Sequence, residues 1–172
     1  MNCRQNWSEK SEVELNKQIG REYHASLAYH VLSNYFNRDD VGLNKLVDYF
    51  NKASLEEREH ADKLMNYQSM RGGIVRLSSI EPLTIDLDKS NDIIEAFQIA
   101  LELEKTINND LLELHKIADE EGDPQFCDYL EGEFLKEQVE SISDISKILS
   151  VLNRLSGSNN DQHGIWNFIQ TL

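Results

Sequence analysis

The stretch SLEEREHADKLM, residues Ser54–Met65, decides how the rest of the chain is interpreted. It contains no Gly or Pro and favours a helix. An apolar stripe leads into it with the three- and four-residue spacing of one helix face. The next two positions of that stripe are Glu57 and His60, and Leu64 then restores it. A Glu-x-x-His pair therefore occupies positions where the pattern predicts a core.

This one helix leaves two interpretations of the pair open. Glu and His one turn apart project from the same helix face. A buried carboxylate is costly unless it is paired or binds a metal. Glu57 is therefore either a buried acid satisfied by an Arg or a backbone group, or part of a metal site, and the other helices must decide.

Length and composition indicate one all-α domain. The chain has 172 residues with only two Pro and eight Gly, and helix-forming residues dominate. We expect a single domain over residues 1–172, with a four-helix bundle over about 11–155, a linker over 156–160 and a terminal helix over about 161–172.

Local patterns predict where the main helices begin and end. Ser-x-x-Glu at 11–14 predicts a capping box for the first helix. The second is expected over about 41–68, ended by Gly72-Gly73. The run Gly122-Asp123-Pro124 predicts a stop followed by a start, and the fourth helix is expected over about 124–155. Gly132 inside it indicates a close approach.

Two further segments complete the predicted architecture. Residues 74–89 contain Pro82 and predict one long crossover between the second and third helices, which lets those two helices run parallel. The tail carries Ile165, Trp166 and Ile169 and is apolar on nearly all sides. It predicts a short fifth helix that is buried in the bundle or in a subunit interface, and we favour the interface.

Charge and cysteine content narrow the possible partners. The net charge is −14, from 31 acidic and 17 basic residues, which argues against nucleic acid and anionic membrane surfaces. Cys3 and Cys127 are the only cysteines and imply no disulfide framework. Free thiols and an N-terminal segment without an apolar run favour a cytoplasmic location.

Each of the four main helices carries a polar residue on its apolar stripe. These residues are Glu22, Glu57, His60, Glu104 and Gln138. Three carboxylates close together cannot all stay ionised without cations, so a metal site is now favoured. Carboxylates with one imidazole suit iron or manganese and are acceptable to zinc. Tyr29 follows Glu22 by two turns on the same face and, taken alone, is a core aromatic with a bonded hydroxyl.

The candidate ligands are unequally divided between two metal positions. Di-iron carboxylate bundles have two Glu-x-x-His motifs, whereas this chain has one and offers Gln138 where the second would stand. We expect one metal to be bound by Glu22, Glu57 and His60. The second would share Glu57 as a bridge and take Glu104. A weakly held second metal suits a site that processes and releases ions.

Motifs along nearly the whole chain resemble the cytosolic ferritin subunit of eukaryotes, most closely its heavy, ferroxidase-bearing type. These motifs are EYHASLAY (22–29), NYFNRDDVGL (34–43), LEEREHADKLM (55–65), RGG (71–73), LEKTINNDLLELHKIADEEGDPQFCDYLE (103–131) and FLKEQV (134–139). The resemblance implies a ferroxidase centre formed by Glu22, Tyr29, Glu57, His60, Glu104 and Gln138.

The same resemblance implies how the protein would work. A shell of 24 subunits, alone or mixed with other ferritin subunits, would oxidise Fe(II) with dioxygen and store the ferric product as mineral. Two iron ions would bind transiently in each subunit, and other divalent metals would compete with them.

Two further groups are implied by the resemblance. An iron entry channel would use His115, Cys127, Asp128 and Glu131, and mineral nucleation would use Glu56, Glu59 and Asp62. Taken alone, the acids of both groups are solvated surface charges. Only a symmetric assembly would turn Asp128 and Glu131 into a ring. Asp62 stands where the family usually has Glu.

Two alternative functions predict different ligands. A storage subunit like the light-type ferritins would lack the ferroxidase ligands, which this chain has. A di-iron enzyme that keeps its metals, such as rubrerythrin or a ribonucleotide reductase small subunit, would carry a second Glu-x-x-His in the fourth helix, which this chain lacks.

Overall fold

The computed structural model describes residues 3–77, 79–80, 85–88, 90–157 and 162–172, and all regular structure within them is helical. The predicted all-α fold, a four-helix bundle with a short C-terminal helix, is therefore confirmed. The elements are α1 (Glu9–Phe36), α2 (Asn44–Met70), α3 (Asp92–Glu120), α4 (Pro124–Leu130), the π-helix η1 (Glu131–Leu135), α5 (Lys136–Gly157) and α6 (Gln162–Ile169).

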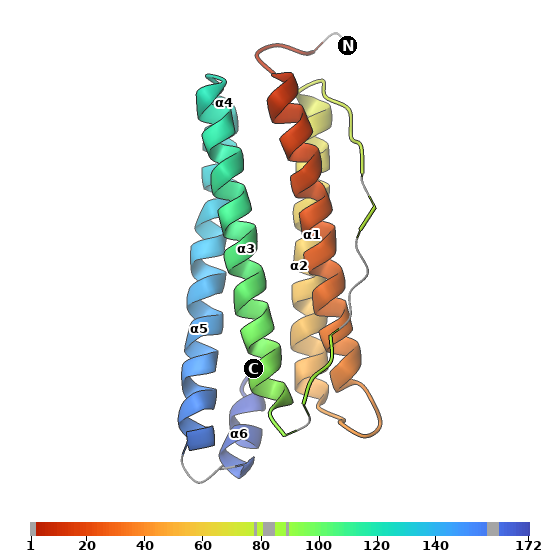
Figure 1. The fold of residues 1–172 in the computed structure, drawn as a ribbon, viewed down its shortest axis with the longest axis vertical. Coiled ribbons are helices and arrows are strands. Elements are labelled where there is room, and N and C mark those ends of the chain that lie inside the picture. Colours follow the sequence, from red (N-terminus) through yellow and green to blue (C-terminus); the bar gives the residue numbers. More distant parts are fainter. Residues whose placement is uncertain (1–2, 78, 81–84, 89, 158–161) are drawn as a thin grey trace.

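The connection between α2 and α3 sets the topology of the bundle. Its described residues lie alongside the bundle, and α2 and α3 point in the same direction, as expected for one long crossover (Figure 1). The other main helices are joined by short turns at the ends of the bundle. Pro82 and its neighbours 81, 83 and 84 lie outside the described residues.

Two helix starts differ from the sequence prediction. The N-cap of α1 is Ser8, whose hydroxyl accepts a 2.9 Å hydrogen bond from the Ser11 amide. Ser11 lies inside the helix and is fully buried, so the predicted capping box is wrong. Helix α2 begins at Asn44 and not near residue 41, because Gly42 has a φ of 64° and belongs to a turn.

The predicted helix ends at the two glycine turns are confirmed. Gly72 has a φ of 76°, and the Gly73 amide donates to the Gln68 carbonyl at 2.9 Å, which closes α2. Gly122 has a φ of 67° after α3, and the Asp123 carboxylate then caps α4 through the Phe126 amide. The glycines are needed because these turns require a left-handed backbone.

The predicted fourth helix is observed over residues 124–157, but a segment in its middle is π-helical. The π-helix η1 separates α4 from α5 and shifts the angular phase of every residue after it. A Cβ on Gly132, within η1, would meet nothing within 4 Å, so the expected close approach is wrong. Glycine instead adds backbone freedom where the regular helix is interrupted.

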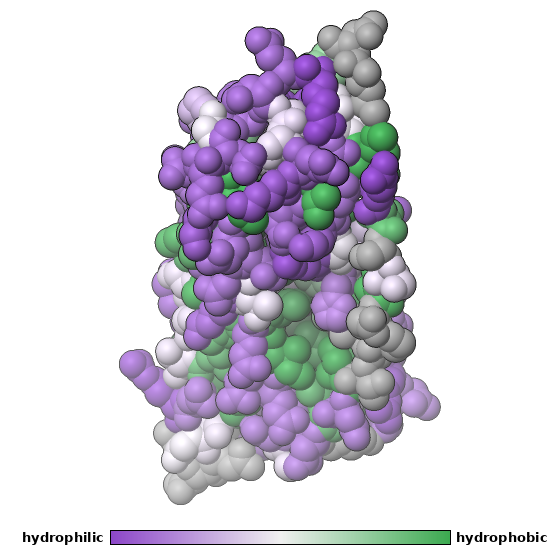
Figure 2. All heavy atoms as spheres, turned by 45° about the horizontal axis from the view of Figure 1, so that its top comes forward, coloured by the Kyte–Doolittle hydropathy of each residue, from purple (hydrophilic) through white to green (hydrophobic). Residues whose placement is uncertain are grey.

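The interior consists of two apolar clusters with a polar layer between them. One is centred on Phe36, Phe50 and Phe97. The other, toward the N-terminal end of α1, is built around Trp7 and Phe126. Glu57 of α2 and Glu104 of α3 lie at the sequence positions where one cluster gives way to the other, and Glu22 of α1 lies among members of the second cluster. The face shown in Figure 2 is largely hydrophilic, with apolar side chains gathered in its lower half.

The terminal helix buries one face inside its own subunit. Ile165 and Ile169 of α6 are buried in the first apolar cluster, whereas Trp166 is 52% exposed. Burial in a subunit interface therefore stays a prediction for the Trp166 side alone. Of the expected linker, residues 156 and 157 belong to α5 and residues 158–160 lie outside the described part of the chain.

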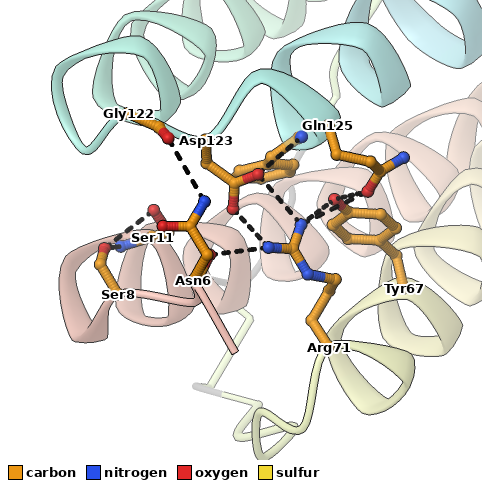
Figure 3. A network of polar contacts seen from close by, with 9 residues as sticks. Asn6, Ser8, Ser11, Tyr67, Arg71, Gly122, Asp123 and Gln125 are labelled. Atoms are coloured by element: carbon orange, nitrogen blue, oxygen red, sulfur yellow. Dashed lines mark hydrogen bonds and ion pairs between the residues drawn. The ribbon is translucent and has the colours of Figure 1, made fainter. Parts of the chain in front are cut away.

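A buried ion pair fastens one end of the bundle (Figure 3). Arg71, just after α2, donates to the Asp123 carboxylate at 2.5 Å and to the Asn6 carbonyl at 2.7 Å. Its guanidinium lies over the Trp7 ring, 4.8 Å from the centroid, and bonds the Tyr67 hydroxyl. One side chain thus joins the N-terminal segment, α2 and the turn between α3 and α4.

We expect Arg71→Met to destabilise the protein by about 3 kcal/mol, because it leaves the Asp123 carboxylate, 3% exposed, buried without its cation. Guanidinium unfolding measures the change. The control is Arg38→Met, whose ion pair with Asp40 is exposed and should contribute less than about 1 kcal/mol. Equal losses in the two variants would contradict this role of Arg71.

Candidate metal centre

Three predicted ligands from two helices meet in one buried cluster. Glu22 of α1 and Glu57 and His60 of α2 offer ligand atoms that all lie within 4.8 Å of one another. All three side chains are buried, and His60 Nδ1 is 3.2 Å from Glu57 Oε2. This is the set expected for the first metal, and metal binding by it stays a prediction.

The spacing of α1 and α2 at this level is set by two small residues. The Ser26 hydroxyl donates to the Ser54 carbonyl at 2.7 Å, and the Ser54 hydroxyl donates to the Ser26 carbonyl at 2.8 Å. These reciprocal bonds lie about one turn from Glu22 and Glu57 along their helices. They bring the two backbones close and fix the register that places Glu22 against Glu57.

A second group lies beside the cluster and is centred on Glu104 of α3. The Tyr29 hydroxyl donates to Glu104 Oε1, so this buried tyrosine is both a core aromatic and a partner of the site. Gln138 Nε2 of α5 donates to Glu104 Oε2 at 2.9 Å and to the Glu104 carbonyl at 3.0 Å. Two neutral donors thus orient the carboxylate.

Burial and mutual repulsion raise the pKa values of these groups. Burial, and then the charge of Glu104, raise the pKa of Glu57 to about 8. Burial, and then Glu57, raise the pKa of Glu22 well above its usual range. Burial and Glu104 do the same to the pKa of the Tyr29 hydroxyl. Without cations, therefore, the cluster holds protons near neutral pH.

One oxygen of the cluster shows that it suits a cation. Glu22 Oε1 accepts from Gln18 Nε2 at 2.7 Å, but Glu22 Oε2 is buried and has no hydrogen-bond partner among the described residues. An ionised Glu22 would leave this buried oxygen without a donor, which is costly, so the metal-free Glu22 and Glu57 share protons. A divalent cation bound to this hard, mixed oxygen and nitrogen set would remove the cost.

We expect the metal-free protein to lose stability as pH rises from about 4.5 to about 8, because Glu57 keeps its proton in the fold while the unfolded chain releases it. Glu57→Gln cannot ionise and should raise the guanidinium unfolding midpoint at pH 8 and hardly change it at pH 4.5. Glu113→Gln, at an exposed position of α3, is the control. A shift of equal size at both pH values would contradict the raised pKa.

The predicted entry-channel residues share one exposed face around α3, α4 and η1. His115 Nε2 is 2.7 Å from Glu131 Oε1, and the Cys127 thiol donates to the His115 carbonyl at 3.9 Å. Asp128 is exposed on the same helix as Cys127. A channel requires symmetric copies of this face, so that role stays a prediction.

Of the predicted nucleation acids, one lines a cavity that also reaches Glu104. Glu56, Glu59 and Asp62 are all exposed on α2. A cavity of about 480 Å³ between α2 and α5 is lined by Glu56 and also by the buried Tyr29 and Glu104. The other two acids do not line it, and the nucleation role of all three stays a prediction.

Two residues that contact the site were not among the predicted site residues. Gln18, the partner of Glu22, lies four residues before it on the same helix face, and this spacing could have revealed it. Glu137 Oε2 lies 3.2 Å from His60 Nε2. Its only sign in the sequence was its place beside Gln138.

The fold and the site together define a helix bundle that encloses a buried cluster of two carboxyl groups and an imidazole. The family model described as "Ferritin-like domain" matches residues 12–155. The chain therefore belongs to the ferritin family, and its function is iron storage.

The curated relatives are plant ferritins. The chain is 44% identical to "Ferritin, chloroplastic" of Malus baccata var. xiaojinensis and 46% identical to "Ferritin-2, chloroplastic" of both Vigna unguiculata and Zea mays. Each alignment covers 99% of this chain and 67% of the relative. The chain thus spans about two thirds of the length of these relatives.

The relatives overturn the predicted cytoplasmic location. Their names place them in chloroplasts, so that prediction is wrong. Its physical basis was weak, because the free thiols of Cys3 and Cys127 do not distinguish one reducing compartment from another. None of the described helices is both long enough and apolar enough to span a bilayer.

Proposed function

We propose that this ferritin subunit oxidises Fe(II) with dioxygen at the buried cluster and passes the ferric product to mineral inside a shell of twenty-four subunits. The observation that carries the proposal is the meeting of Glu22, Glu57 and His60 in the core, where their ligand atoms lie within 4.8 Å of one another. A set of carboxylates that repel one another, completed by an imidazole, is suited to bind divalent cations.

The two iron ions are substrates, and the residues give them unequal positions. One Fe(II) would be held by Glu22, Glu57 and His60. The second would share Glu57 and take Glu104, beside the neutral amide of Gln138. Binding would displace the protons held by Glu22 and Glu57, so iron uptake should release protons. Zinc and manganese would compete for the same ligands.

Oxidation transfers one electron from each Fe(II) to dioxygen. Tyr29 keeps its proton because its pKa is raised, and its hydroxyl therefore holds Glu104 in place as a hydrogen-bond donor. The second position has fewer charged ligands and should release its ferric ion first. The cavity from Glu104 to Glu56 supports release toward the face of α2 that carries the acids Glu59 and Asp62.

Two further parts of the proposal are the entrances of the shell and the cellular compartment. In a shell, alone or mixed with other ferritin subunits, symmetric copies of the His115, Cys127, Asp128 and Glu131 face would form acidic entrances that attract Fe(II). The chloroplastic names of the relatives support a plastid as the site of storage.

We expect Glu57→Ala combined with His60→Ala to slow the initial rate of aerobic Fe(II) oxidation at least tenfold, because the variant removes two of the three ligands of the first position. Oxidation is followed by the absorbance of the ferric product after one small addition of Fe(II) per subunit.

The control for this experiment is Glu140→Ala, an exposed acid on α5, which should oxidise iron at the wild-type rate. Sedimentation should show particles near twenty-four subunits for all three proteins. An unchanged initial rate in the double variant would refute the site, and wild-type protein that sediments as a monomer or dimer would refute the shell.

A further inference from the structure

His60 lies between two carboxylates, only one of which belongs to the buried cluster. Its Nδ1 is 3.2 Å from Glu57 Oε2, and its Nε2 is 3.2 Å from Glu137 Oε2. The Glu57 side chain is 4% exposed and that of Glu137 is 43% exposed. The imidazole therefore has an inner nitrogen facing the cluster and an outer nitrogen facing an acid at its rim.

We propose that Glu137 is a positioning residue that fixes the tautomer and ring orientation of His60, so that Nδ1 is free to bind the metal. The proposal rests on the metal site proposed above. A neutral imidazole carries one N–H, and the nitrogen that binds a metal must present its lone pair. A carboxylate at Nε2 accepts that proton and directs the lone pair to Nδ1, toward Glu57.

The local helix geometry lets one segment serve both halves of the site. Adjacent residues of an α-helix point about 100° apart. Gln138 therefore faces the core and bonds Glu104, while Glu137 faces the rim and meets His60. Both come just after the π-helix η1, which ends at Leu135 and sets their angular phase.

An aromatic ring also packs against the imidazole of His60. The ring of Phe134, at the end of η1, lies 5.6 Å from the His60 ring at 65° and covers one side of it. Phe134 is 2% exposed and supplies no polar group. Carboxyl groups thus face both nitrogens of His60, through a hydrogen bond at Nδ1 and at an ion-pair distance of 3.2 Å at Nε2, and only Glu137 lies outside the cluster.

The test uses the assembled protein and Co(II) under anaerobic conditions, with affinity and visible absorption spectrum as the two measurements. We expect Glu137→Ala to bind Co(II) about 10- to 100-fold more weakly at the His60 position, with an altered spectrum. Glu137→Gln keeps an oxygen that accepts the Nε2 proton and should restore most of the affinity. Glu140→Gln, one turn along α5, should match wild type.

The outcomes separate the positioning role from the site itself. Unchanged Co(II) affinity in Glu137→Ala would overturn the positioning role. The loss of one whole bound Co(II) per subunit, with the affinity of the other bound Co(II) unchanged, would also overturn it, because Glu137 would then be a metal ligand. Failure of the Gln variant to recover would also overturn it. Wild-type protein that binds no Co(II), or a His60→Ala variant that binds it normally, would refute the metal site and the positioning role together.

Discussion

The structure depends on the enclosure of like-charged groups between two apolar clusters. Glu22, Glu57 and Glu104 are each at most 4% exposed, and burial and repulsion raise the pKa of Glu57 to about 8. The metal-free fold therefore keeps carboxyl protons that the unfolded chain would release. The cost in stability is offset when cations replace those protons. The same property would favour the binding of divalent cations, and it makes the metal-free site costly in folding free energy.

The scaffold is arranged to tolerate that cost. Reciprocal hydrogen bonds between Ser26 and Ser54 hold α1 against α2 beside the cluster. The Arg71–Asp123 pair fastens the end of the bundle where α2, the N-terminal segment and the start of α4 meet. Packing on both sides of the polar layer keeps the helices from separating under the repulsion. In the proposed function, the unequal ligand sets would divide the site into a stronger and a weaker position.

The sequence predicts the parts of this arrangement that follow helix periodicity. Glu22, Glu57, His60 and Glu104 break apolar stripes at regular spacing, so the helices that carry them and their convergence can be inferred. Periodicity fails where the helix itself changes. The π-helix over 131–135 inserts a phase shift that no residue pattern announces, and the position of Glu137 depends on it.

Other features depend on more than local sequence. The N-cap of α1 is Ser8 and not the predicted capping box at 11–14, because Ser11 is buried inside the helix and does not cap it. The predicted cellular compartment was wrong because free thiols indicate a reducing environment and do not identify which reducing compartment holds the protein. The channel and nucleation acids require symmetric copies of the chain, and a single subunit shows them only as exposed charges.

Anomalous X-ray scattering at the iron edge, from crystals of the assembled protein soaked anaerobically in Fe(II), tests the central claim most directly. It should show two peaks in each subunit, a stronger one among Glu22, Glu57 and His60 and a weaker one between Glu57 and Glu104. Iron found only at exposed acids, with the buried cluster empty at saturating Fe(II), would contradict the account.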